Sequence, residues 1–128
     1  MATQPPRPSL RLATVNIDCA DAQAMADFYG RLLGWGVTYR DHDFVLMRDP
    51  AGGTGLSFQQ REGYRPPVWP ERPGEQDKMI HLDIKVTDLE AAVAHALDAG
   101  ARLAEYQPRP DLRVLLDPSG HPFCLFLN

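Results

Sequence analysis

The sequence has little of what marks membrane, secreted or nucleic-acid-binding proteins. Its two cysteines, Cys19 and Cys124, both lie in apolar strand patterns, which indicates buried, reduced thiols of a cytoplasmic protein rather than a disulfide. No apolar run approaches the roughly 18 residues of a membrane span. The N-terminus, MATQPPRPSL, lacks the apolar stretch of a secretory signal, and a disordered lead is predicted over residues 1–9. The formal net charge of −4 argues against binding to nucleic-acid phosphates.

Short catalytic motifs are absent as well. No glycine-rich phosphate loop, Ser-His-Asp order or Cys-x-x-Cys pair occurs in the chain. With 44% apolar and 23% charged residues, the 128-residue chain has the composition of one soluble globular domain. Function therefore has to be argued from the organisation of the chain.

What the sequence does contain is an internal repeat. VNIDCADAQAMADFYGRLLG begins at Val15, and LDIKVTDLEAAVAHALDAGA begins at Leu82, about 67 residues later. Each segment has an alternating strand pattern, an aspartate that can cap a helix (Asp21 or Asp88), and a helical run that ends at a glycine. An Asp-Pro turn later in each unit extends the repeat. Two such units predict a pseudo-twofold protein with a ligand-binding cleft between its halves.

The pattern predicts an α+β fold of two tandem βαβββ modules, which form a curved mixed sheet around the cleft with the helices outside. The first module spans about residues 10–60 and the second about residues 79–128, within a single domain over residues 10–128. Helices are expected from Asp21 to Gly34 and from Asp88 to Gly100. Strands are expected at residues 12–19, 35–40, 44–48 and 55–60, and again at 80–86, 102–106, 112–116 and 123–127.

Residues 61–78, REGYRPPVWPERPGEQDK, form a linker between the modules and contain four prolines. A structureless stretch of this length within a compact domain is usually either functional or a linker. Its large side chains, Tyr64 and Trp69, either pack over the cleft as a lid or pin the linker to the sheet. The sequence favours neither interpretation.

Several features resemble the vicinal oxygen chelate superfamily, which includes glyoxalase I, the bleomycin-resistance proteins and the extradiol dioxygenases. They are the double βαβββ unit, FYGRLLG at residues 28–34 and DPSGHPFCL at residues 117–125. Residues 81–93 and 120–128 are most similar to the small glyoxalase-like domain proteins of bacteria. The resemblance covers nearly the whole chain and implies the same fold, a binding cleft and a homodimer. The fold alone does not imply one reaction, because it hosts isomerases, dioxygenases, lyases and drug binders.

The resemblance also implies four cleft-facing positions, which hold the metal in metal-dependent members: Thr14, Ser57, His81 and Cys124. Strand alternation independently places Thr14 and His81 on polar faces. Such enzymes typically use histidine and glutamate ligands, whereas two hydroxyls, one imidazole and one thiol stand here, a poor set for a divalent ion. No cofactor is therefore predicted. The alternative is an atypical zinc site on His81 and Cys124, completed by Asp83 or by a bound ligand.

His81 is the strongest candidate for a catalytic acid or base, with Asp83 or Asp18 beside it. Cys124 could act as a nucleophile only if its pKa were depressed, and packing in an apolar strand is the simpler interpretation. His121 lies in a Gly-His-Pro turn, which turn geometry explains without a functional role.

These observations favour a small-molecule binding protein of the bleomycin-resistance type, with neither nucleic acid nor a membrane as partner. The alternative is an isomerase or lyase related to glyoxalase I that uses His81 as acid–base or in an atypical metal site. A third interpretation is a partner module with a vestigial cleft. The residues expected to bind the ligand are Thr14, Asn16, Ser57, Tyr64, Trp69, His81, Asp83, Cys124 and Phe126.

Overall fold

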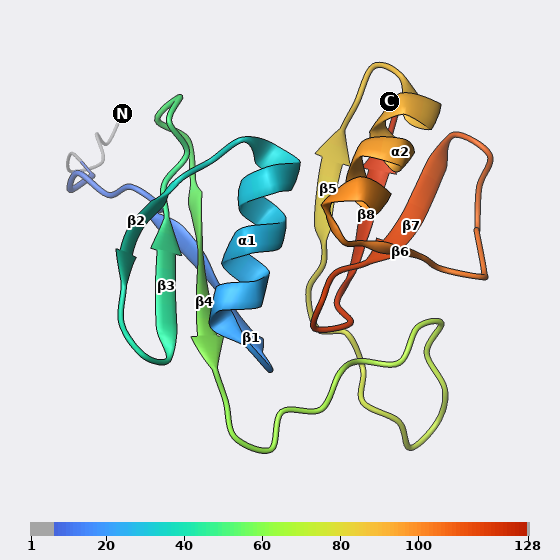
Figure 1. Ribbon diagram of the computed structural model, residues 1–128, viewed down its shortest axis with the longest axis horizontal. Coiled ribbons are helices and arrows are strands. Elements are labelled where there is room, and N and C mark those ends of the chain that lie inside the picture. Colours follow the sequence, from blue (N-terminus) through green and yellow to red (C-terminus); the bar gives the residue numbers. More distant parts are fainter. Residues whose placement is uncertain (1–6, 128) are drawn as a thin grey trace, which may run out of the picture.

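The computed structural model describes residues 7–127, and these form two modules, each with one helix and one four-stranded sheet (Figure 1). The lead expected over residues 1–9 falls mostly outside the described residues. The first module contains β1 (Thr14–Cys19), α1 (Ala22–Leu33), β2 (Val37–Arg40), β3 (Phe44–Met47) and β4 (Gly55–Gln60). The second contains β5 (Leu82–Lys85), α2 (Leu89–Ala99), β6 (Arg102–Leu103), β7 (Leu112–Leu116) and β8 (Pro122–Phe126).

Strand order is equivalent in the two sheets and confirms the α+β fold with two βαβββ modules. The orders are β1-β4-β3-β2 and β5-β8-β7-β6. The first and last strands of each module are parallel, and the other neighbours are antiparallel, so the mixed sheet is built as two four-stranded halves. This register places Asn16 opposite Ser57 in the first module and Asp83 opposite Cys124 in the second.

The two helices begin with the same hydrogen bond, as the repeat predicts. Oδ1 of Asp21 accepts from the backbone N–H of Ala24 at 3.0 Å, and Oδ1 of Asp88 accepts from that of Ala91 at 3.0 Å. Each bond satisfies one of the N–H groups that a helix N-terminus leaves without an intrahelical partner. α1 ends at Gly34, whose φ of 74° is the left-handed conformation that glycine adopts without steric cost.

The strand expected at residues 102–106 is shorter in the structure, because the side chain of Gln107 takes the place of backbone hydrogen bonds to the neighbouring strand. Nε2 of Gln107 donates to the carbonyl oxygens of Ala104 and Val114 at 2.8 and 2.9 Å, and its Oε1 accepts from Val114 N at 2.8 Å. β6 therefore ends at Leu103, although the backbone polar groups beyond it are satisfied.

The two modules share one hydrophobic core. Tyr29 of α1 stacks on Phe58 of β4 with ring centroids 5.5 Å apart, and its neighbour Phe28 meets Phe123 of β8 at 5.7 Å. All four rings are buried. Because α1 packs against strands of both modules, the burial of its aromatic face stabilises their association. In Figure 1, α1 lies between the sheet of the first module and the second module, and α2 lies in front of β8.

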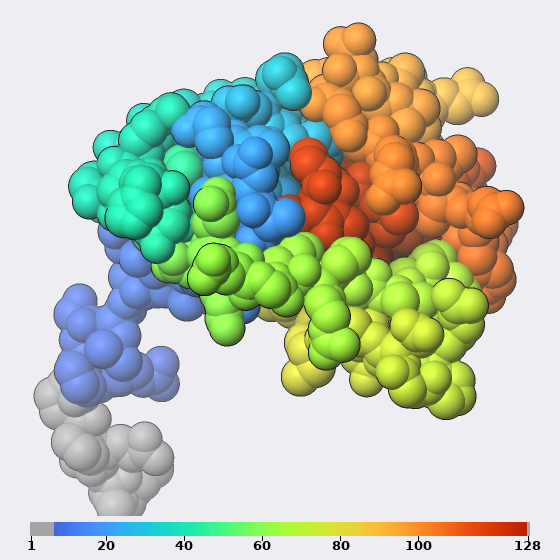
Figure 2. All heavy atoms as spheres, turned by 60° about the horizontal axis from the view of Figure 1, so that its bottom comes forward, coloured from blue at the N-terminus to red at the C-terminus, as the bar shows by residue number. Residues whose placement is uncertain are grey.

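The linker stays close to the modules rather than extending into solvent. Figure 2 shows it as a green to yellow band that crosses both modules on one face of the molecule. None of the helices among the described residues is long and apolar enough to cross a membrane.

Candidate functional site

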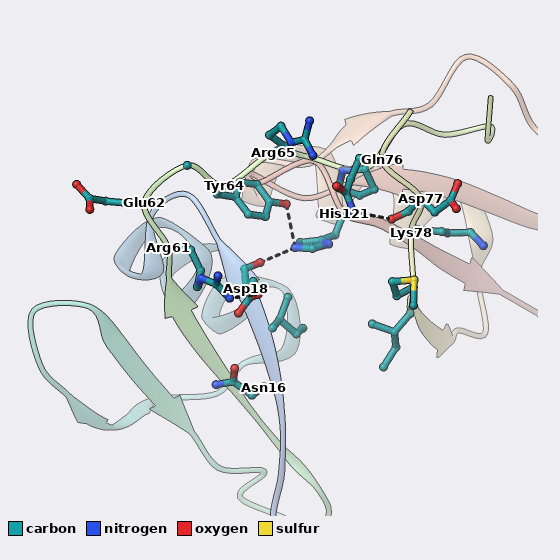
Figure 3. A pocket seen from close by; sticks show the side chains of 15 residues that line it. Asn16, Asp18, Arg61, Glu62, Tyr64, Arg65, Gln76, Asp77, Lys78 and His121 are labelled. Atoms are coloured by element: carbon teal, nitrogen blue, oxygen red, sulfur yellow. Dashed lines mark hydrogen bonds and ion pairs between the residues drawn. The ribbon is translucent and has the colours of Figure 1, made fainter. Parts of the chain in front are cut away.

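A cavity of about 460 Å³ lies between β1 and the linker. Residues 16–18 of β1 form one wall, and much of the linker, continuing to Met79 and Ile80, forms the other. His121 reaches it from the turn before β8. The labelled side chains of Asn16, Asp18 and His121 lie around this space in Figure 3, whereas Glu62 and Lys78 extend away from it.

Strand alternation positions the β1 wall. Ile17 and Cys19 are buried against the core, so the intervening Asn16 and Asp18 are exposed on the opposite face. Asp18 forms an ion pair with Arg61, with Oδ2 and Nη1 3.1 Å apart. Both side chains are about half exposed, so the pair contributes little to stability. The guanidinium group of Arg61 is therefore accessible and available for a further contact.

His121 is held by hydrogen bonds to both walls of the cavity. Its Nε2 lies 2.7 Å from the carbonyl oxygen of Asp18 and 3.0 Å from the hydroxyl of Tyr64. That hydroxyl donates to the carbonyl oxygen of Ser119 at 2.8 Å. Since the Asp18 carbonyl can only accept, the network assigns the proton of the neutral ring to Nε2. Burial, reinforced by the charge of Asp117, raises the pKa of Tyr64, which keeps the phenol neutral.

A buried carboxyl group shapes the turn that carries His121. Oδ1 of Asp117 accepts from the backbone N–H groups of Ser119 and His121 at 2.9 and 3.0 Å, and Oδ2 accepts from the hydroxyl of Tyr29 at 2.8 Å. Burial raises the pKa of Asp117, although these hydrogen bonds and the nearby His121 oppose the shift. Ser119 continues the connection, because its Oγ accepts from the backbone of Ala20.

His121 was missed as a site residue because its role depends on a contact across the chain. The one local indication is the comparison of the two Asp-Pro turns. Counting from Asp49 and Asp117, the position of His121 corresponds to Gly53 in the first module. A histidine that stands in place of a turn glycine in only one of the two repeats is the sequence signal for a role of His121.

A second group of polar side chains gathers on the sheet of the second module. Nδ1 of His81 lies 3.8 Å from Oδ1 of Asp83 and 3.8 Å from Sγ of Cys124. The shared strand face that the alternation predicted for His81 and Asp83 is therefore present. Burial and the negative charge of Asp83 raise the pKa of Cys124, so the depressed pKa that a nucleophilic thiol requires is not provided here.

The remaining predicted residues of the first module lie beside β4. Nδ2 of Asn16 donates to Oγ of the buried Ser57 at 2.9 Å, and the hydroxyl of Thr14 bonds to the carbonyl oxygen of Val15. Both hydroxyls thus have partners within their own module. Neither hydroxyl is a charged metal ligand, so the four positions implied by the resemblance do not make a ligand set for a divalent ion.

The two large linker side chains have different surroundings. Tyr64 lines the cavity. Trp69 instead packs against a small apolar cluster of Ala104, Val114 and Cys124 on the sheet of the second module, with its ring 5.4 Å from that of Tyr106. Phe126 is half-buried at the end of β8 and does not line the cavity.

Comparisons with known proteins agree with this architecture. The chain resembles a crystal structure of a glyoxalase/bleomycin resistance protein/dioxygenase family enzyme from Burkholderia phytofirmans PsJN, with 24% identity, a TM-score of 0.67, and coverage of 91% of this chain and 97% of the other. The trypanothione-dependent glyoxalase I of Leishmania major has 20% identity, a TM-score of 0.65, and coverage of 93% and 87%. TnmS3, an antibiotic binding protein from Streptomyces sp. CB03234, has 15% identity, a TM-score of 0.63, and coverage of 95% and 98%.

Likeness at these identities establishes the fold and no more. No curated protein matches the chain. The family model described as Glyoxalase-like domain, however, matches residues 14–126, which is nearly every residue that the two modules comprise. The chain therefore belongs to the glyoxalase-like domain family.

Proposed function

We propose that the chain binds a small amphipathic molecule, without covalent chemistry, in the cavity between β1 and the linker. The observation that carries the proposal is the cavity itself. Its volume of about 460 Å³ lies within the range of roughly 300–1,000 Å³ that is usual for small-molecule sites. A strand of the first module and the connection to the second module both contribute to it.

The chemistry of the walls supports an amphipathic ligand. Met79 and Ile80 are 89% and 55% exposed at the cavity, and Ile17 and Pro67 add further apolar surface. A ligand that covered these side chains would remove apolar area from water, which stabilises the complex. On the polar side, the N–H groups of Arg61 that do not bond to Asp18 can donate to an anionic or acceptor group.

The residues at the family's metal positions also favour binding over catalysis. The hydroxyls of Thr14 and Ser57 are engaged within the first module, so the family positions provide no shared metal centre that could activate a substrate. The fold likeness to an antibiotic binding protein is compatible with this proposal. We extend the proposal to a homodimer, which the family resemblance suggests and which sedimentation equilibrium would test. The two free, buried cysteines favour the cytoplasm as its compartment.

A thermal-shift screen tests the proposal. Bleomycin and a panel of aromatic and amphipathic antibiotics would be added to the untagged protein. A ligand at about 100 times its dissociation constant stabilises the native state by about 2.7 kcal/mol, which corresponds to a rise of several degrees in Tm. At least one chemical class should give a saturable shift. If the panel produced none, this function would be rejected.

One observation favours a second candidate, an isomerase or lyase related to glyoxalase I. His81 is half-buried with its Nδ1 3.8 Å from Oδ1 of Asp83, and a histidine beside a carboxylate is a common general acid–base arrangement. The test compares the turnover of hemithioacetals and other substrates with adjacent oxygens by the wild type and by His81→Ala. Turnover that depends on His81 would support catalysis, and equal rates in both proteins would count against it.

A further inference from the structure

One nitrogen of the His121 imidazole is engaged within the protein, and the other is free. Nε2 donates its proton to the carbonyl oxygen of Asp18 at 2.7 Å, so Nδ1 of the neutral ring carries a lone pair that can accept a hydrogen bond. Nδ1 has no hydrogen-bond partner among residues 7–127. Every buried side-chain nitrogen and oxygen of these residues does have a partner, so the free Nδ1 is accessible to solvent.

The hydrogen bonds of Nε2 fix the position of Nδ1. Turning the ring about its Cβ–Cγ bond would take Nε2 away from both the Asp18 carbonyl and the Tyr64 hydroxyl, which lies 3.0 Å from it. The backbone N–H of His121 is held as well, by Oδ1 of Asp117 at 3.0 Å. The lone pair is therefore preorganised, and a ligand that used it would not have to order the side chain first.

His121 lies where two voids meet. It lines the cavity of about 460 Å³ and also a smaller void of about 20 Å³, which lies between the first strands of the two modules. Val15, Leu82 and Pro122 are among the apolar residues around the smaller void, and Ile80 lines both voids. Such walls give water few polar partners, so a polar ligand group beside them depends on the imidazole for its hydrogen bond.

Arg61 complements His121, because a guanidinium group only donates hydrogen bonds, whereas the free Nδ1 only accepts them. Asp18 holds both residues at the cavity: its carboxylate pairs with Arg61, and its carbonyl oxygen accepts from His121 (Figure 3). The cavity therefore offers a ligand both a donor and an acceptor, next to the apolar surface of Ile80.

From this arrangement we propose that His121 is a specificity-determining residue of the cavity, and that it selects ligands with a hydroxyl or N–H donor on an apolar ring system. Nδ1 accepts the hydrogen bond from that donor. The inference rests on the function proposed above and names the class of ligand. A ligand of the same shape without a donor would leave Nδ1 covered and unpaired, which costs binding free energy.

Two matched compounds test the proposal. One is 2-naphthol, which has a hydroxyl donor, and the other is its methyl ether, which has the same ring system and an acceptor oxygen but no donor. Their affinities for the untagged protein are measured by fluorescence titration at mildly alkaline pH. We expect the affinity of 2-naphthol relative to the ether to be about two- to tenfold higher in the wild type than in His121→Phe, the range that one net hydrogen bond supplies.

The comparison of ratios separates selection from structure. His121→Phe also loses the bonds to Asp18 and Tyr64, but a general loosening of the cavity would weaken the binding of both compounds alike and leave the ratio unchanged. His95→Phe is the matched control and should keep the wild-type ratio, since His95 is an exposed histidine of α2 that does not line the cavity. An equal ratio in the wild type and His121→Phe would overturn the proposal.

A measurement on the wild type keeps the test valid if His121→Phe does not fold. In protein with ¹⁵N-labelled histidine, the Nδ1 resonance of His121 should shift on addition of 2-naphthol and stay in place on addition of the ether. A resonance that does not respond to bound 2-naphthol would overturn the proposal. Saturable binding of both compounds without the expected change in ratio would overturn the inference alone and leave the proposed function standing. Binding of neither compound would reject the inference and count against that function as well.

Discussion

The hydroxyl of Tyr29 donates a hydrogen bond of 2.8 Å to Oδ2 of Asp117, and both residues are only 1% exposed. The bond connects α1 of the first module to the turn between β7 and β8 of the second. Because the same carboxyl group accepts from the backbone of His121, the core contact between the modules also orients a side chain at the cavity.

Tyr29→Phe should destabilise the protein. The substitution leaves a buried carboxyl oxygen without its donor, and the cost of such an unsatisfied group is about 1–3 kcal/mol in the free energy of unfolding. Urea denaturation measures it. The control is Tyr39→Phe, which removes an exposed hydrogen bond of 3.3 Å to Asp41 and should change stability by less than about 0.5 kcal/mol. Equal effects of the two substitutions would refute the role assigned to Tyr29.

Asp117→Asn should change how stability depends on pH. Burial raises the pKa of Asp117 in the folded protein, so its carboxyl retains a proton that the unfolded chain has already lost. The contribution of Asp117 is therefore complete below about pH 3.9 and is lost as pH rises through the raised pKa, at no more than about 1.4 kcal/mol per pH unit. The difference in unfolding free energy, wild type minus Asp117→Asn, should fall as pH rises above 4.

Asp111→Asn is the control for that pH series. Hydrogen bonds from Arg109 lower the pKa of Asp111, so its contribution is present above the unfolded pKa and is lost only as pH falls below it. The difference in unfolding free energy between the wild type and Asp111→Asn should be flat above about pH 5. A flat profile for Asp117→Asn as well would contradict the raised pKa of Asp117.

The thiol of Cys19 should be unreactive in the native protein. Burial, with the negative charges of Asp117 and Asp21, raises its pKa to about 12, and the residue has no exposed surface. Only the thiolate is nucleophilic, so alkylation at pH 8 should be negligible until the chain is unfolded. Iodoacetamide labelling with peptide mass spectrometry distinguishes Cys19 from Cys124. Rapid native labelling of Cys19 would show that the region around it opens readily.

Trp69→Ala should release the linker. The half-buried indole packs on the sheet of the second module, and its loss should cost about 1–3 kcal/mol, less than for a fully buried aromatic. Trypsin should then cleave faster after Lys78, within the freed segment. Cleavage after Arg40, in the hairpin of the first module, serves as an internal control and should proceed at the wild-type rate. Similar acceleration at both sites would indicate global unfolding instead.

The helices and most strands could be predicted because their causes are local. Asp21 and Asp88 cap the helices through bonds to residues three positions away, and the glycines that follow end them. The polar face of β1 follows from alternation alone. The early end of β6 could not be predicted in this way, because it depends on Gln107 bonding to Val114 on the neighbouring strand.

The cavity was harder to predict than the fold. Asn16 and Tyr64 were expected to bind the ligand and line it, but its walls are completed by His121, whose partner Asp18 lies 103 residues earlier in the sequence. No local pattern indicates a contact at that separation. The path of the proline-rich linker depends on similar contacts, because Tyr64 bonds to the turn of the second module.

Binding constants for Arg61→Ala and Arg109→Ala test the central claim most directly, with the best compound from the thermal-shift screen as ligand. The two arginines are matched, since their side chains are 60% and 63% exposed and each pairs with an aspartate, but only Arg61 lines the cavity. The loss of a charged hydrogen bond, about 1.5–3 kcal/mol, should weaken binding by at least about tenfold in Arg61→Ala. Arg109→Ala should bind like the wild type. Unchanged affinity in Arg61→Ala would contradict binding in this cavity.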